Sequence, residues 1–155
     1  MESLKILNSK ERKEVSRKID EQFGCGFEFD YDMFMNNKNK VFILNRDASM
    51  SKIAELRINS LGLYFCEINE RGELRLSIEG SQIIGKIAKK NILELDDEHA
   101  SKWMCGEDFE IDSDVHGFVI IKNNSDFLGC GKIVNKRLYN YVPKERRSGP
   151  GASQN

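Results

Sequence analysis

Three segments of the sequence decide the fold: Gly117-Phe-Val-Ile-Ile-Lys122, Phe127-Leu-Gly-Cys-Gly-Lys132 and Arg137-Leu-Tyr-Asn-Tyr-Val-Pro-Lys-Glu-Arg-Arg147. Each reads as a short strand with positive charge at its ends, because apolar and aromatic residues run together there between turn-forming residues. Residues 122–147 contain seven basic and two acidic side chains, although the formal net charge of the 155-residue chain is only -1. The basic residues are Lys122, Lys132, Lys136, Arg137, Lys144, Arg146 and Arg147. This local excess is a candidate binding site for phosphates.

The composition is that of a folded protein with one domain or two small ones. A hydrophobic content of 39% suffices for small cores. The near balance of 24 basic and 25 acidic residues argues against coating a nucleic acid through bulk charge, so any such site must be a patch. No apolar stretch approaches the roughly 20 residues that span a bilayer, and the start of the chain lacks the layout of a secretory signal. We therefore expect a cytoplasmic protein with no membrane contact.

The four cysteines, Cys25, Cys66, Cys105 and Cys130, lie far apart and form no C-x-x-C pair. Only two histidines are available to help them hold a metal. The sequence therefore predicts buried free thiols, with no metal site and no cofactor.

The first 88 residues predict a small mixed α+β domain. Asn8 and Glu11 form a capping box for a helix that ends at Gly24. Alternating residues over 27–44 predict a hairpin, residues 50–58 a short helix, and residues 61–68 and 74–77 two paired strands. Ser77 caps a further helix, and the junction between domains is expected at Lys89-Lys90-Asn91.

Residues 89–147 predict a second domain built mainly of strands. A strand at 92–95 is followed by a helix that Asp96 caps and Gly106 ends, with Trp103 facing inward, and then by at least three strands. One helix among five short strands suggests a small, twisted, partly closed barrel. The predicted fold class is α+β, and residues 148–155 are expected to form a disordered tail.

The second half of the chain resembles a PUA domain, an RNA-binding fold. The resemblance lies in residues 90–108, in Gly117-Phe-Val-Ile-Ile121 and in Phe127-Leu-Gly-Cys-Gly131. Residues 128–133 and 138–147 are similar to the RNA-binding module of Sun-type RNA cytosine-5 methyltransferases. The two-domain layout, with Ser60-Leu-Gly-Leu-Tyr-Phe65 ahead of the PUA-like part, looks like that of Nip-seven type ribosome-biogenesis proteins. The resemblance implies binding to ribosomal or transfer RNA, in ribosome biogenesis or RNA modification, without chemistry of the chain's own.

The residues argue against a methyltransferase activity. In the methyltransferases the attacking cysteine follows a proline, whereas neither Pro143 nor Pro150 precedes a cysteine here. No glycine-rich turn leads from a strand into a helix, as a nucleotide-like cofactor would require. We therefore expect a non-catalytic protein. The residues expected to bind RNA are Lys89, Lys90, Lys132, Lys136, Arg137, Asn140, Tyr141, Lys144, Arg146 and Arg147.

Other conspicuous residues have simpler explanations. Gly129 and Gly131 are expected to let strands pack closely, and Trp103 to lie in the core. The carboxylates around Asp96 are typical of a solvated face and a helix N-terminus. Tyr141 fits base stacking and packing equally well.

Two other functional classes remain open from the sequence. In the first, the chain is an adaptor that docks an RNA methyltransferase or a ribosome assembly factor. In the second, it is an enzyme acting on a small ligand at the domain junction, which predicts a deep pocket with perturbed titratable groups.

Overall fold

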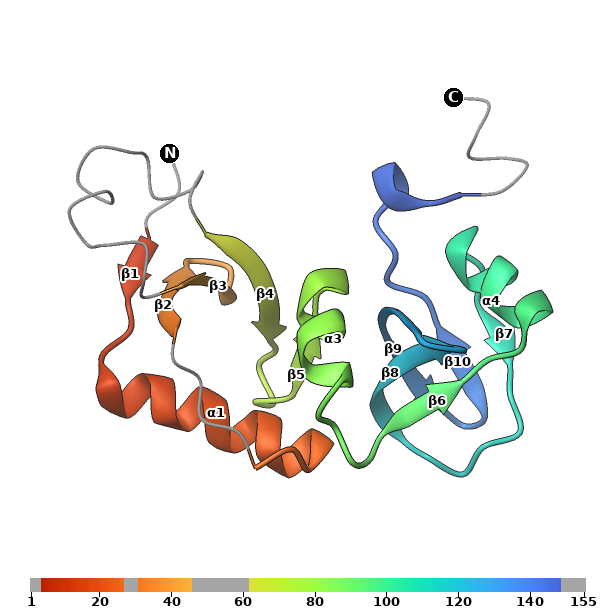
Figure 1. Cartoon of the computed structure of the whole chain (residues 1–155), viewed down its shortest axis with the longest axis horizontal. Helices are drawn as coiled ribbons and strands as arrows, with labels where there is room; N and C mark the ends of the chain where they lie inside the picture. Colours follow the sequence, from red (N-terminus) through yellow and green to blue (C-terminus); the bar gives the residue numbers. More distant parts are fainter. Residues whose placement is uncertain (1–3, 27–30, 46–61, 149–155) are drawn as a thin grey trace.

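The structure is a computed structural model that describes residues 4–26, 31–45 and 62–148. Within these residues it contains two five-stranded sheets and the helices α1, α3 and α4. Figure 1 shows the N-terminal sheet on the left, the C-terminal sheet on the right and α3 between them. The predicted α+β class is confirmed. No helix within the described residues is long and apolar enough to cross a membrane.

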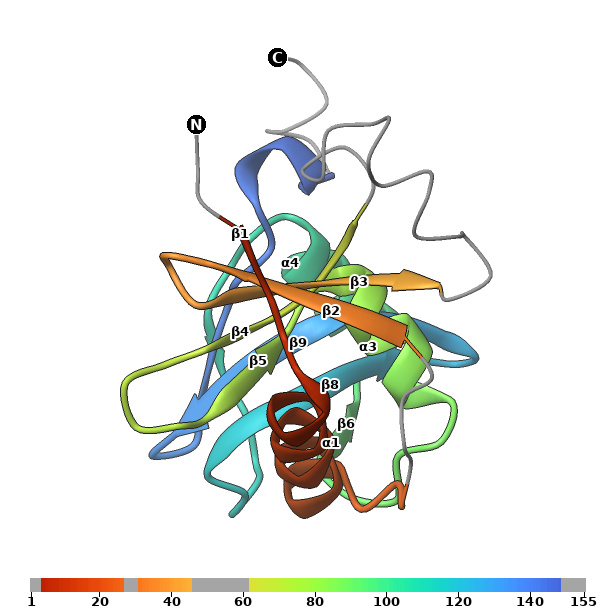
Figure 2. The same cartoon turned by 90° about the vertical axis from the view of Figure 1, so that its left-hand side faces the viewer.

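The N-terminal sheet is antiparallel, and its strands lie side by side in chain order. They are β1 (Leu4–Ile6), β2 (Tyr31–Asn36), β3 (Lys40–Asn45), β4 (Leu63–Ile68) and β5 (Leu74–Leu76). Helix α1 (Ser9–Phe23) begins at the predicted capping box and ends at Gly24, whose φ of 63° is left-handed. Its apolar stripe of Val15, Ile19 and Phe23 is buried. Figure 2 views this helix nearly end-on, below the strands.

The C-terminal sheet has the order β6-β8-β9-β10-β7, with β6 parallel to β8 and the other pairs antiparallel. The strands are β6 (Ile92–Glu94), β7 (Phe109–Glu110), β8 (Gly117–Asn123), β9 (Asp126–Val134) and β10 (Arg137–Tyr139). Helix α4 (Asp97–Met104) begins at the predicted cap Asp96 and buries Trp103 completely. A Cβ atom on Gly131 would lie 2.7 Å from Cη2 of Trp103. The core role of Trp103 and the packing role of Gly131 are thus confirmed.

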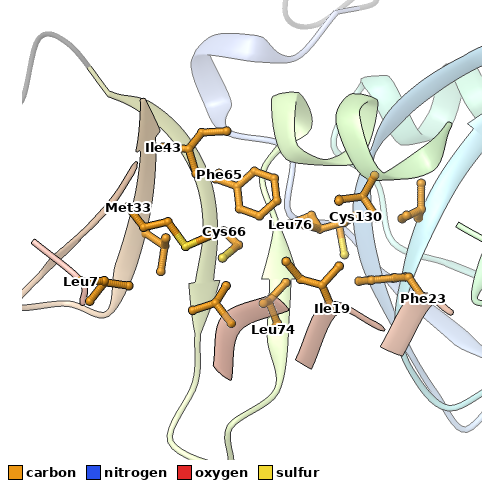
Figure 3. Packing of buried hydrophobic residues seen from close by; sticks show 14 residues of the cluster. Leu7, Ile19, Phe23, Met33, Ile43, Phe65, Cys66, Leu74, Leu76 and Cys130 are labelled. Atoms are coloured by element: carbon orange, nitrogen blue, oxygen red, sulfur yellow. The ribbon is translucent and has the colours of Figure 1, made fainter. Parts of the chain in front are cut away.

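The two sheets share a core. Helix α3 (Ile78–Gly85) packs on β9, and a Cβ atom on Gly85 would lie 2.4 Å from Cδ1 of Phe127. The main apolar cluster contains Ile120 and Cys130 of the C-terminal sheet together with residues of α1 and the N-terminal sheet. Figure 3 shows Cys130 and Leu76 in this cluster, between the two sheets. The expected boundary at 88/89 falls in the loop between α3 and β6, and the independence of the two halves stays a prediction.

Several details differ from the sequence-based expectations. Strand β1 and the 3₁₀ turn η2 (Lys144–Arg146) were not predicted, and β10 ends at Tyr139 rather than running on to Val142. Two of the four cysteines, Cys25 and Cys105, are partly exposed, so the prediction of four buried thiols is wrong for them. The expected helix at 50–58 and residues 149–155 of the expected tail lie outside the described residues.

Candidate nucleic-acid interface

The structure does not bring all the predicted basic residues to one surface. Lys89 and Lys90 lie in the loop after α3, where their backbone N–H groups donate to the carbonyl of Phe23 at the end of α1. Lys144 and Arg146 lie in η2. In Figure 1 the loop is at the lower edge of the molecule and the 3₁₀ turn at the upper edge. A short RNA segment bound at one of these sites would not reach the other.

Lys136 and Arg137 occupy the turn and start of β10, in acidic surroundings. The Nζ atom of Lys136 lies 3.6 Å from an oxygen of Asp112 and 3.3 Å from one of Asp114. The guanidinium of Arg137 lies 6.0 Å from the centre of the Tyr139 ring. The two carboxylates offset the charge of Lys136, which weakens its attraction for a phosphate.

Asn140 has a structural role. Its side-chain amide donates to the carbonyl of Trp103 at 2.8 Å and to that of Glu107 at 3.2 Å, and its oxygen accepts from the Val142 N–H at 2.7 Å. Both amide donors are therefore in use, and the side chain ties the end of the chain to α4. The expectation that Asn140 reads bases stays a prediction, and a base would have to displace these bonds to reach the amide.

Arg147 is likewise held by the fold. Its Nε donates to the carbonyl of Val142 at 3.1 Å, and the guanidinium packs over Gly106, where a Cβ atom would lie 2.3 Å from Nε. The side chain is thus preoriented, and the absence of a Cβ at Gly106 is what leaves room for it.

The predicted residues Tyr141 and Lys132 belong to a cation–aromatic row that crosses the two sheets. The row consists of Arg75 on β5, Tyr141 after β10, Phe118 on β8 and Lys132 on β9. The Arg75 guanidinium lies 4.6 Å from the centre of the Tyr141 ring, and Lys132 Nζ lies 5.1 Å from that of Phe118. The two ring centres are 6.0 Å apart. Tyr141 is 38% exposed, so part of it is accessible from solvent.

Arg75 was missed by the sequence analysis, although a signal for it exists. It stands between Leu74 and Leu76, which are both buried, and alternation along a strand therefore points it to the opposite side. The sequence could not show that Arg75 meets Tyr141 on this side.

Each cation of the row has a carboxylate partner. Arg75 donates to Glu67 at 3.0 Å, and Lys132 Nζ lies 3.7 Å from Glu73. Hydrogen bonding from Asn69, with help from Lys132, lowers the pKa of Glu73 and keeps it ionised. The formal charges of the row and these partners cancel, so the row favours stacking on rings and guanidinium planes over long-range attraction of phosphate.

A crevice of about 260 Å³ lies beside the row, between the β5–α3 corner and the segment 141–146. Tyr64, Arg75, Ile78 and Tyr141 are among its lining residues, and Arg146 pairs with Glu79 there at 2.8 Å. Burial raises the pKa of Tyr64 to about 12. The phenol of Tyr64 therefore remains neutral at physiological pH.

The second half of the chain is similar to a known protein family. Residues 90–148 match the family described as the methyltransferase RsmF PUA domain. The predicted resemblance to the PUA domain of RNA methyltransferases is confirmed. The matched segment contains β6 to β10, α4 and η2, and hence Tyr141, Phe118 and Lys132 of the row.

Three relatives that share one name align with more than half of the chain. The chain is 25% identical over 137 residues to ribosomal RNA small subunit methyltransferase F of Vibrio cholerae serotype O1 (strain M66-2), an alignment that covers 88% of this chain and 28% of the relative. It is 26% identical to the protein of that name from Aliivibrio salmonicida (90% and 29% covered) and 30% identical to that from Aeromonas salmonicida (59% and 19% covered). The chain thus spans less than a third of the length of these relatives.

Proposed function

We propose that this chain, whose residues 90–148 match the RsmF PUA domain, is a non-catalytic module that binds single-stranded ribosomal RNA in the service of its modification. The observation that carries the proposal is the cation–aromatic row, which offers a half-exposed tyrosine ring held between a guanidinium and a second ring. Unpaired bases stack on such surfaces whatever their identity. The relatives, which are named as methyltransferases of small-subunit ribosomal RNA, suggest the class of RNA.

The thiols support the absence of methyl-transfer chemistry. Cys66 and Cys130 are fully enclosed, and burial raises the pKa of Cys66 strongly and that of Cys130 to about 12. A thiol with such a pKa holds almost no thiolate at neutral pH and cannot attack a base. Neither Cys25 nor Cys105, the more exposed pair, follows a proline.

Exposed apolar side chains on the N-terminal sheet favour the adaptor alternative. Ile6 on the edge strand β1 is 50% exposed, and Leu63 at the start of β4 is 41% exposed. An edge strand with an exposed apolar side chain can pair with a strand of another protein. A partner that is retained on the immobilised chain after RNase treatment, and is lost with Ile6→Lys, would favour this function.

The proposed function is tested with fluorescein-labelled single-stranded fragments tiled along small-subunit ribosomal RNA. Affinity is measured by fluorescence anisotropy for the parent, for Tyr141→Ala and for the double variant Lys89→Ala/Lys90→Ala. We expect Tyr141→Ala to weaken binding roughly five- to 150-fold, since stacking contributes about 1 to 3 kcal/mol per base. The double variant, changed at the far edge of the molecule, is the matched control and should bind as the parent does.

Two outcomes would contradict the proposal. If no fragment binds the parent at micromolar concentration, the chain is not an RNA-binding module of this kind. If Tyr141→Ala binds normally and the Lys89/Lys90 variant does not, the RNA site lies at the α1–β6 edge rather than at the row.

A further inference from the structure

We propose that the crevice beside the row is a subsite for one nucleobase of the bound RNA, turned out of the stack and inserted between the two sheets. This inference rests on the proposed function and deepens it, because it assigns the base that follows the one on Tyr141. It concerns residues of both halves of the chain: Tyr64 and Ile78 on one side, Tyr141 and Pro143 on the other.

The walls of the crevice suit a flat, largely apolar group. Its lining includes the apolar side chains of Ile78, Trp103, Val142 and Pro143 together with Tyr64 and Tyr141. Its volume of about 260 Å³ lies just below the roughly 300 to 1,000 Å³ of pockets for drug-sized ligands, which favours a smaller ring system. Tyr141 lines the crevice as well as belonging to the row, so a strand stacked on this ring would pass beside the crevice.

Tyr64 supplies an unused polar group. Its hydroxyl is buried, although the ring is only partly so, and it has no hydrogen-bond partner among the described residues. A hydroxyl in this state is destabilising, and because it both donates and accepts it can pair with the polar edge of a base once the ring shifts towards the crevice.

The charges at the rim argue for a base rather than a phosphate. Glu79 and Glu145 both line the crevice, and the guanidinium of Arg146 is already paired with Glu79. A phosphate would meet these two carboxylates and two cations, Arg75 and Arg146, that are each already paired with a carboxylate. A neutral base meets no such repulsion, and its N–H groups can donate to a carboxylate.

The test uses a uridine decamer that carries one 2-aminopurine at its centre, a base whose fluorescence is quenched on stacking. Three variants are compared with the parent: Tyr64→Phe, which removes only the hydroxyl; Ile78→Trp, which fills the crevice; and Gln82→Trp, which adds the same side chain on the exposed side of α3. Anisotropy of a labelled decamer gives affinity, the 2-aminopurine signal reports insertion, and thermal unfolding verifies each fold.

We expect the parent to quench the 2-aminopurine on binding. Tyr64→Phe should weaken binding roughly twofold to tenfold, the loss for one hydrogen bond, while the free protein unfolds at the same or a higher temperature, since the removed hydroxyl had no partner. Ile78→Trp should abolish the quenching yet still bind through the row, and Gln82→Trp should behave as the parent.

The inference is overturned if the parent binds the decamer and the 2-aminopurine signal is the same with Ile78→Trp as with the parent, whether quenched or not. The proposed function would survive this result, because the row would still bind the strand. If the decamer does not bind the parent at all, both the subsite and the proposed function fail.

Discussion

Salt dependence of RNA binding is the property that the paired charges of the row predict most directly. Single-stranded RNA loses affinity with a slope of log affinity against log salt of about -0.7 per neutralised phosphate. Four free cations would give a slope of about -3. In the structure, however, Lys132, Lys136 and Arg146 each lie within 4.0 Å of a carboxylate. Lys144 and Arg147, which follow Tyr141 in the chain, have no such partner among the described residues, and two phosphate contacts would give a slope of about -1.4.

The perturbation is the double variant Glu67→Gln/Glu73→Gln. It removes the negative charges beside Arg75 and Lys132, while each glutamine keeps the size of the glutamate it replaces. Two freed cations should steepen the slope by about 1.4, to roughly -2.8, and raise the affinity most at low salt. Anisotropy titrations at five salt concentrations between about 50 and 200 mM, a range over which the slope is linear, give both values.

The control is Asp96→Asn/Asp97→Asn, which removes the same negative charge from the α4 N-terminus, away from the row. It should leave the slope unchanged. If the Glu67/Glu73 variant keeps the slope of the parent, Arg75 and Lys132 do not approach phosphate in the complex. If the parent itself has a slope near -3, the ion pairs of the free protein open on binding, and the reasoning from the unbound charges is refuted.

Two further predictions concern the fold that holds the site. Gly131→Ala should destabilise the protein by about 1 to 3 kcal/mol, because the new Cβ lies 2.7 Å from Trp103 and 2.8 Å from Leu138. In urea unfolding, the double variant Gly131→Ala/Trp103→Phe should lose less unfolding free energy than the sum of the two single losses, because Trp103→Phe removes the ring that clashes. Strictly additive losses would contradict this packing. Burial raises the pKa of Tyr64 from 10.0 to about 12, so between these pH values the folded state keeps the phenol proton while the unfolded state loses it. Stability should therefore fall as pH rises from about 10 to about 12, and fall less steeply in Tyr64→Phe, as measured by thermal unfolding at each pH.

Local signals in the sequence were sufficient for most helices and strands. The capping box at Asn8 and Glu11, the caps Ser77 and Asp96, and the left-handed glycines at 24 and 106 act within one turn of the residues they order. Strand β1 escaped prediction because three residues carry no period, and its pairing with β2 depends on a partner about thirty positions away.

The candidate site was harder to predict because its residues meet across the two sheets. Tyr141 and Lys132 were predicted from the charge and aromatic pattern, but the pattern could not show that Lys136 sits beside two carboxylates. The side chain of Asn140 is of a type that can read bases. Only the structure shows that its amide already donates to the carbonyls of Trp103 and Glu107. Arg75 and Tyr64 belong to the half of the chain without a family match, so nothing in the sequence joined them to the site.

The unit that carries the proposed function is therefore larger than the matched family segment. Residues 90–148 alone would lack Arg75, Tyr64 and the α3 wall of the crevice, and would expose Ile120 and Cys130, which are 0% and 4% exposed in the whole chain. The ring of Phe127 would also lose the contact that Gly85 permits. The alignment with the Vibrio cholerae relative covers 88% of the chain, so it extends beyond the matched segment into the N-terminal half. The shared core holds the row and the crevice next to each other. The proposed base subsite therefore needs both sheets and not only the PUA-like half.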